Sequence, residues 1–251
     1  MICPVKRLLI SLALLSAPWL AAVAAPAVPV KANPPPAFED TMAQRTLACS
    51  SCHGAQGRAG PDGYYPRIAG KPAGYLYNQL LNFRDGRRHY GLMTRLLEPL
   101  SDAYLLDIAT HFASLDLPYP APAPSQAPAA MMERGRVLAR QGDTARGIPA
   151  CAHCHGERLT GVRPNTPGLL GLPRDYLNAQ LGAWRNGQRR AHEPDCMAHI
   201  ARTLPADDLN AVAAWLAAQP LPADTHPAPR LAQAPTMACG SAVLPAGRAV
   251  R

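Results

Sequence analysis

The sequence CSSCH at residues 49–53 returns as CAHCH at residues 151–155. Two thiols three residues apart can form thioethers with the two vinyl groups of one porphyrin, and the histidine that follows is then held beneath the iron as its proximal ligand. We therefore predict two covalently bound haem c groups. The residues concerned are Cys49, Cys52 and His53 in the first motif and Cys151, Cys154 and His155 in the second.

Cys-x-x-Cys alone also occurs in zinc sites, redox-active dithiols and structural disulfides. A zinc ribbon would place both pairs around one metal, usually with a much shorter interval between them, and it needs no histidine directly after each pair. A thioredoxin-like dithiol would lie in an α/β context, and the sequence has no convincing alternating strand pattern. Haem attachment is therefore favoured over these alternatives.

The N-terminus reads as a secretory signal peptide. Lys6 and Arg7 form a positive start, residues 8–20 are largely apolar, and the AVA at residues 22–24 supplies a small-x-small cleavage site. An uncleaved membrane anchor is the alternative, because the apolar stretch approaches the length that spans a bilayer. Pro18 and the alanine-rich end favour cleavage. We therefore expect export to the periplasm.

The cysteine count is informative once the haem motifs are set aside. Of seven cysteines, Cys3 leaves with the signal peptide and four belong to the haem motifs, which leaves Cys196 and Cys239. Two spare thiols in an oxidising compartment predict a disulfide. Two free buried thiols are the alternative, because a sequence does not show whether two Cα atoms approach within bonding range.

The composition fits a soluble, loop-rich, helical protein, with 48% hydrophobic residues, 28 prolines and a formal net charge of +8. That charge falls to +6 when Lys6 and Arg7 leave, and haem propionates offset part of the remainder. A basic balance can indicate nucleic acid or an anionic membrane. The mature chain has no basic run beyond Arg87-Arg88 and Arg189-Arg190. We therefore predict acidic protein partners and no nucleic acid, and a loose association with the membrane surface stays open.

The chain contains a tandem duplication. YLYNQL at residues 75–80, followed by FRDGRR at 83–88, returns as YLNAQL at 176–181, followed by WRNGQR at 184–189. Each copy is expected to be one haem domain. The predicted parts are a signal peptide at 1–24, a first haem domain at 25–117, a Pro/Ala-rich linker at 118–128, a second haem domain at 129–220 and a Pro/Ala-rich tail at 221–251.

Helical spacing of apolar residues recurs in the same order in both copies. First helices are expected at 38–48 and 131–141, each leading to a haem-binding loop, and second helices around the repeated Tyr-Leu segments. Third helices should begin near Ser101 and Pro205. They should bury Tyr104, Leu105, Ile108 and Phe112 in the first copy and Leu209, Val212 and Leu216 in the second. A domain of about 90 residues has a thin core, which haem would fill.

Met93 and Met197 lie at matching places, just before the third helix of each copy. A methionine thioether is a soft, neutral iron ligand that raises the reduction potential relative to two histidines. Ordinary core packing is the alternative for a methionine, but repetition at one place favours ligation. His89 and His192 are rival ligands that do not align with each other, and we interpret them as surface or propionate-side histidines.

These motifs together resemble the dihaem cytochrome c4 family over nearly all of residues 38–219. The resemblance implies an all-α fold of two tandem class I cytochrome c domains, each wrapped around one haem. It also implies that carbonyl oxygens of Pro66 and Pro167 accept from Nδ1 of the two motif histidines, which fixes the imidazole rings. In that family the haems pass electrons from the cytochrome bc complex toward terminal oxidases.

Two function classes stay open. The first is an electron carrier between a respiratory donor, either the cytochrome bc complex or a dehydrogenase, and a terminal oxidase or other acceptor. The second is a cytochrome subunit of a periplasmic dehydrogenase or a dihaem peroxidase. Methionine candidates on both haems argue against a peroxidase, which needs an open axial site. We predict an electron-transfer protein with no catalytic residues, in which a bridge from Cys196 to Cys239 pins the tail over the methionine side of the second haem.

Overall fold

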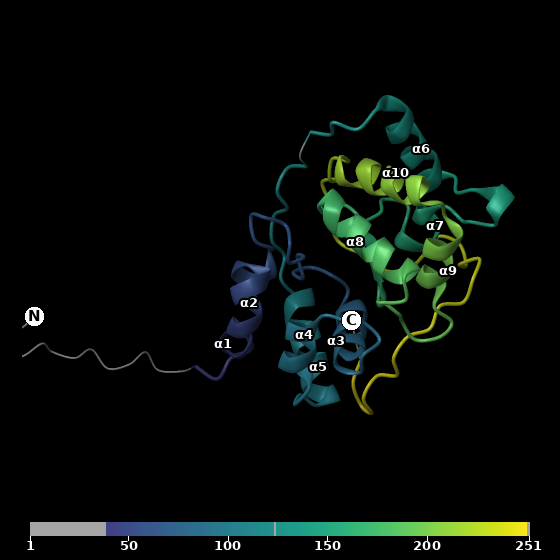
Figure 1. Cartoon of the computed structure of the whole chain (residues 1–251). Coiled ribbons are helices and arrows are strands. Elements are labelled where there is room, and N and C mark those ends of the chain that lie inside the picture. The colour runs from purple at the N-terminus through teal and green to yellow at the C-terminus, as the bar shows by residue number, and fades with distance from the viewer. Residues whose placement is uncertain (1–38, 123, 250–251) are drawn as a thin grey trace, which may run out of the picture. The chain divides into compact units, whose positions relative to one another are not determined.

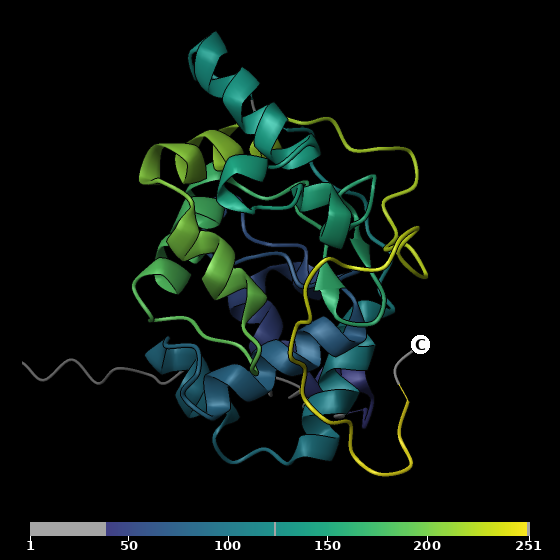
Figure 2. The ribbon, with the colours of Figure 1, turned by 90° about the vertical axis from the view of Figure 1, so that its right-hand side faces the viewer.

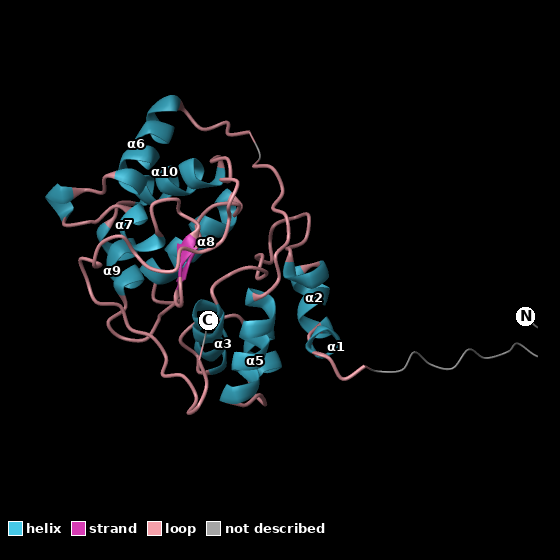
Figure 3. Ribbon diagram, turned by 180° about the vertical axis from the view of Figure 1, so that it is seen from behind, coloured by secondary structure: helices cyan, strands magenta, loops and turns pink. Residues whose placement is uncertain are grey.

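Helices dominate the part of the chain that the computed structural model describes, which is residues 39–122 and 124–249 (Figure 1). The predicted signal peptide at 1–24 lies outside these residues. Seen from behind, the described chain shows one short pair of strands among the helices (Figure 3). These are β1 (Gly161–Val162) and β2 (Thr166–Pro167), antiparallel, with Gly161 opposite Pro167. The predicted all-α class is confirmed.

For brevity, residues 39–117 are called the first half and residues 129–220 the second half; these boundaries remain predictions. The first half contains α1 (Met42–Arg45), α2 (Leu47–His53), the 3₁₀ turn η1 (Ala55–Gly57), α3 (Ala73–Arg84), α4 (Gly91–Leu97) and α5 (Asp102–Ala113). The second half contains α6 (Ala129–Arg140), η2 (Thr144–Arg146), α7 (Cys151–His155), α8 (Arg174–Arg185), α9 (Cys196–Thr203) and α10 (Ala206–Ala217). Within the described residues, no helix has the length and apolar character to cross a membrane.

The helices expected to begin near Ser101 and Pro205 are α5 and α10, and both begin where their capping residues predict. The Ser101 hydroxyl caps α5 by accepting from the Tyr104 amide at 3.3 Å. Helix α10 follows Pro205 and carries two aspartates in its first turn, where the helix dipole favours negative charge. The expected apolar residues of both helices are buried, except Tyr104, which is half-buried.

The prediction of one continuous helix over residues 38–48 is wrong. Helix α1 ends at Arg45, and α2 starts at Leu47 and runs through the haem motif, which is therefore helical and not a loop. The break falls at Thr46, a buried residue whose hydroxyl donates to the Met42 carbonyl at 2.7 Å. Such side-chain bonds compete with helix continuation. The second motif is likewise helical, in α7.

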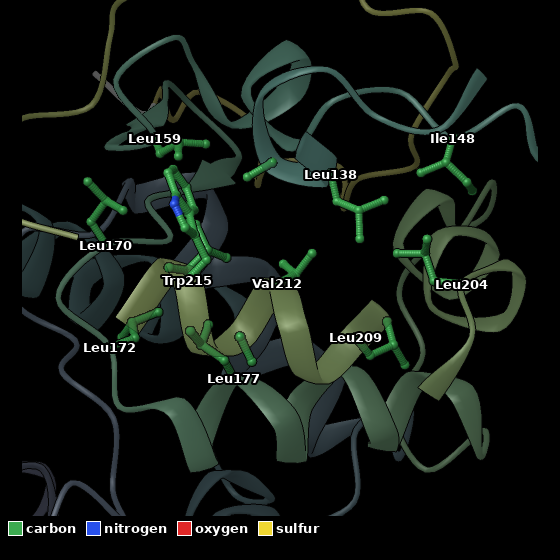
Figure 4. Close-up of a cluster of buried hydrophobic side chains, with 13 residues drawn as sticks. Leu138, Ile148, Leu159, Leu170, Leu172, Leu177, Leu204, Leu209, Val212 and Trp215 are labelled. Carbon is green, nitrogen blue, oxygen red and sulfur yellow. The ribbon is translucent and has the colours of Figure 1, made fainter. Parts of the chain in front are cut away.

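Two hydrophobic clusters form the core. The first is built on α3 and α5, around Leu76, Leu105 and Phe112. The second is built on α6, α8 and α10, and its side chains converge on a shared space in Figure 4, among them Leu138, Ile148, Leu204, Leu209 and Val212. These five side chains also line the cavity described below. Neither half is closed by its own side chains alone.

Helices α6 and α10 cross in close contact. A Cβ atom on Gly135 would lie 2.2 Å from the Ala211 carbonyl oxygen, so only glycine fits at this crossing. Arg134 of α6 holds the same pair of helices by donating to Asp208 of α10 at 2.7 Å and to Asp143 at 2.8 Å. This packing positions α7, which follows α6 and carries the second haem motif.

The predicted disulfide is confirmed, because Cys196 and Cys239 are bonded with their Cα atoms 5.3 Å apart. The tail before the bridge is also placed. Ala228 pairs with Val162 of β1, its amide donating to the Gly161 carbonyl and its carbonyl accepting from the Arg163 amide, both at 2.9 Å. The tail therefore packs on the second half although its sequence has no periodicity.

Breaking this disulfide should destabilise the protein. The bridge closes a loop over a sequence separation of 43, for which the chain-entropy model gives on the order of 4 kcal/mol as an upper figure. We expect Cys239→Ser to lower the free energy of unfolding of the haem-loaded protein by up to this amount, measured by guanidinium titration. Adding reductant to the variant is the control and should cause no further loss. Equal stabilities of wild type and variant would contradict the prediction.

Candidate functional site

The two haem motifs present the same set of groups. His53 ends α2 and His155 ends α7, and each is buried, with 8% and 7% of its surface exposed. The four motif cysteines take part in no disulfide. Each helical turn thus places two free thiols and one buried imidazole close together, which is the arrangement that covalent haem attachment requires.

Each motif histidine is oriented by a backbone carbonyl. His53 Nδ1 lies 2.8 Å from the Pro66 carbonyl oxygen, and His155 Nδ1 lies 2.8 Å from that of Pro167. A carbonyl only accepts, so Nδ1 carries the proton and Nε2 keeps its lone pair. Burial also lowers the pKa of both histidines, which favours the neutral ring. Both imidazoles are therefore prepared to bind a metal through Nε2.

A cavity of about 1290 Å³ runs between these groups, and both halves of the chain contribute to its lining. All ten residues singled out in the sequence line it: Cys49, Cys52, His53, Pro66, Met93, Cys151, Cys154, His155, Pro167 and Met197. Met93 lies on α4 and Met197 on α9, and both are half-buried. The rivals His89 and His192 line the same cavity, His89 exposed and His192 half-buried.

Helices α4 and α9 were not predicted. They span 7 and 8 residues, too few for a periodic apolar pattern to stand out. Local capping marks the second of them, because the Asp195 side chain accepts from the Ala198 amide at 3.0 Å. Asp195, two residues before Met197, was the sequence signal that could have predicted the start of α9. Each methionine candidate is therefore held on a short helix and not on a loop.

Buried donors in the cavity wall fit the carboxylates of haem. Trp184 Nε1 and His192 Nε2 are buried and have no hydrogen-bond partner among the residues that the structure describes, and both residues line the cavity. Lys71, only 5% exposed, donates to the Gly168 carbonyl at 3.3 Å and forms no ion pair within the described residues. Buried donors and charges without partners are costly. Haem propionates would supply anionic acceptors, so the residues present fit this cofactor.

The sequence analysis missed an arginine pair that joins the two halves. Arg88 donates to Gln180 at 2.6 Å and to Gln79 at 3.0 Å, and Arg189 donates to Gln79 and Gln180, both at 2.8 Å. Each guanidinium also stacks on an aromatic ring of its own half, Phe83 or Trp184. The partners all belong to the duplicated motif, so its symmetry was the signal that could have revealed this contact.

The chain was compared with known proteins, and no family model matches it. It is 43% identical to the thiosulfate dehydrogenase electron acceptor of Thiomonas intermedia, over 69% of this chain and 79% of that protein. It is 33% identical to cytochrome c4 of Pseudomonas aeruginosa, over 68% of this chain and 84% of that protein. The chain belongs to the dihaem cytochrome c4 family. It accordingly carries two haem c groups and serves in electron transfer.

Solved structures agree with this assignment. Reduced recombinant cytochrome c4 from Pseudomonas stutzeri matches with a TM-score of 0.60 at 30% identity, over 70% of this chain and 96% of that chain. The thiosulfate dehydrogenase TsdBA from Marichromatium purpuratum matches with a TM-score of 0.62 at 34% identity, over 70% of this chain. This chain spans 40% of the length of that dehydrogenase. The cytochrome c4 match confirms the fold of two class I cytochrome c domains.

Trp184 should tune one of the two haems. Its indole N–H is buried in the cavity wall and has no acceptor in the described part of the chain, whereas the corresponding residue of the first half is Phe83, which has no donor. We expect Trp184→Phe to lower the reduction potential of one haem, because a propionate without its donor leaves more negative charge beside the iron and favours Fe(III). Spectroelectrochemical titration measures both potentials.

Trp215→Phe is the matched control. Trp215 is buried in the second hydrophobic cluster but does not line the cavity, so its replacement should leave both potentials in place. Unchanged potentials in Trp184→Phe, or equal shifts in the two variants, would show that the indole does not face a propionate.

Proposed function

We propose that His53 and Met93 ligate one haem iron and His155 and Met197 the other. The supporting observation is that all four residues line one cavity, with each histidine oriented by a backbone carbonyl. Haem iron supplies one-electron chemistry when bound in this way. Each histidine would hold the iron through Nε2, while its Nδ1–H donates to the carbonyl oxygen of Pro66 or Pro167.

The remaining residues of the cavity would adjust the reduction potentials of the haems and would take part in no chemical reaction. Met93 and Met197 as iron ligands would leave no ligand position open to a substrate, and a thioether ligand favours Fe(II). The largely apolar lining would keep water away from the iron. Lys71 and Arg189, both buried, would offset propionate charge. This arrangement suits electron transfer, and no residue of it is assigned a catalytic role.

The names of the relatives support a proposal for the direction of electron flow. We propose that a periplasmic dehydrogenase, of which thiosulfate dehydrogenase is the leading case, reduces this cytochrome, and that a terminal oxidase or another respiratory acceptor oxidises it. The support is the 43% identity to a protein named as a thiosulfate dehydrogenase electron acceptor. The cytochrome bc complex remains the second donor to test. The proposed location is the periplasm, reached with the signal peptide at residues 1–24.

A second candidate is a permanent cytochrome subunit of such a dehydrogenase. It is favoured by the match to TsdBA, in which a region similar to this chain makes up part of a longer thiosulfate dehydrogenase chain. A subunit would leave size-exclusion chromatography with its dehydrogenase at every salt concentration. A free carrier would separate from the dehydrogenase as added salt screens their contact.

Replacing each methionine by histidine tests the proposed ligation. Histidine is a stronger donor that favours Fe(III), so Met93→His and Met197→His should each retain both haems and lower the potential of one haem. The two variants should affect different haems, which redox titration of both centres resolves. His89→Ala and His192→Ala are the matched controls and should not change the sixth ligand. A wild-type haem without the iron–sulfur absorption band, together with a changed sixth ligand in one control variant, would assign ligation to that histidine.

The donor is tested with purified proteins. Thiosulfate dehydrogenase from Thiomonas intermedia, supplied with thiosulfate, should reduce both haems of this cytochrome, followed by the rise of the reduced α-band. A mixture without thiosulfate is the control. Reduction by a quinol-supplied cytochrome bc complex but not by the dehydrogenase would contradict the proposed donor and leave the carrier function intact.

A further inference from the structure

The C-terminal tail crosses from the second half of the protein to the first, as the yellow segment shows in Figure 2. On the first half it meets Asn78 of α3, a buried side chain with 9% of its surface exposed. The Asn78 amide nitrogen donates to Ser241 Oγ at 2.9 Å, and its oxygen accepts from the Ala242 amide at 2.7 Å. One asparagine therefore binds the tail through both atoms of its amide.

Apolar contacts extend this attachment. Ala242 and Leu244 are half-buried against the hydrophobic cluster of the first half. Farther along, Arg248 donates to Asp107 of α5 at 2.6 Å, but both side chains are well exposed. Exposed ion pairs contribute little to stability. The attachment to the first half therefore depends on Asn78 and on the apolar residues beside it.

The same segment is fixed to the second half just before it crosses. Cys239 is bonded to Cys196 of α9, and the Gly240 amide donates to the Pro194 carbonyl at 2.9 Å. A Cβ atom on Gly240 would lie 2.3 Å from the carbonyl oxygens of His192 and Glu193, so only glycine fits there. A covalent anchor and a close backbone contact thus hold the tail two residues before it reaches Ser241.

Helix α3 is also the helix through which the first half contacts the second. Besides Gln79, which bonds Arg189, the Tyr75 amide donates to the Pro164 carbonyl at 3.1 Å. A Cβ atom on Gly74 would lie 2.2 Å from Asn165 Oδ1, so the backbones approach closely at this point. The tail therefore binds a helix of the first half that also contacts the second half, so displacement of this helix would change the spacing of the two haem motifs.

We propose that residues 239–245 form a strap, anchored by the disulfide, that holds α3 against the second half and so fixes the spacing of the two haems. Asn78 is the positioning residue that the strap binds. Because Cys239 is covalently fixed, Ser241 and Ala242 stay at high effective concentration beside Asn78. The proposal depends on the two haems exchanging electrons within the chain but not on the identity of any partner.

The test uses the full haem-loaded protein and two truncations. Ending the chain after Gly240 keeps the disulfide but removes both hydrogen bonds between the tail and Asn78. Ending it after Pro245 is the matched control, because it removes the exposed Arg248 contact and keeps both hydrogen bonds of the tail to Asn78. Hydrogen exchange of the α3 and α8 amides reports separation of the halves, and pulse radiolysis gives the rate of electron transfer between the haems.

We expect the Gly240 truncation to speed exchange in α3 about tenfold, as loss of two buried hydrogen bonds implies, and to slow or spread the inter-haem rate, with both reduction potentials unchanged. The Pro245 truncation should match wild type. Asn78→Ala and reduction of the disulfide should each also speed exchange in α3. These two changes test the proposal even where the truncated chain does not fold. Unchanged exchange in all of these would overturn the strap. Faster exchange with an unchanged inter-haem rate would overturn its role in spacing the haems.

Discussion

Each half of this protein folds around a cavity that its own side chains do not fill. Leu138, Ile148 and Val212 converge on this space in the second half, and Leu76 and Phe112 line it in the first. An empty apolar cavity of this size would be strongly destabilising. Two covalent haems resolve the problem, since they supply the missing apolar volume to both clusters. We therefore expect folding and cofactor binding to be coupled in this family member.

The buried cations between the two halves also require the cofactors. Arg189 and Lys71 are buried, and their partners within the described residues are neutral amides, phenols and carbonyls. Buried cations of this kind need anions nearby. Haem propionates would meet that need and would neutralise the region where the halves meet. The arginine pair, the cofactors and the strap then all act at one place, on helix α3 and its surroundings.

The sequence predicted those features that depend on short spacing. Cys-x-x-Cys-His predicted the haems, the count of cysteines predicted the bridge to Cys239, and apolar periodicity predicted α3, α5, α8 and α10. It failed where structure depends on one residue or on distant contacts. The first helix breaks at Thr46, whose hydroxyl bonds the carbonyls of the preceding turn. The tail has no pattern of its own, and its place depends on Asn78, which lies 164 positions from Ala242.

The fold and the proposed function depend most on two haems that are each held by one histidine and one methionine. Optical spectroscopy of the oxidised, purified protein tests this directly, together with a haem count per chain after denaturation in acid acetone. We predict two haems that stay covalently attached, and an iron–sulfur absorption band with the intensity of two methionine-ligated centres. A band of half that intensity, or none, would contradict the shared ligation, and fewer than two attached haems would contradict the fold built around them.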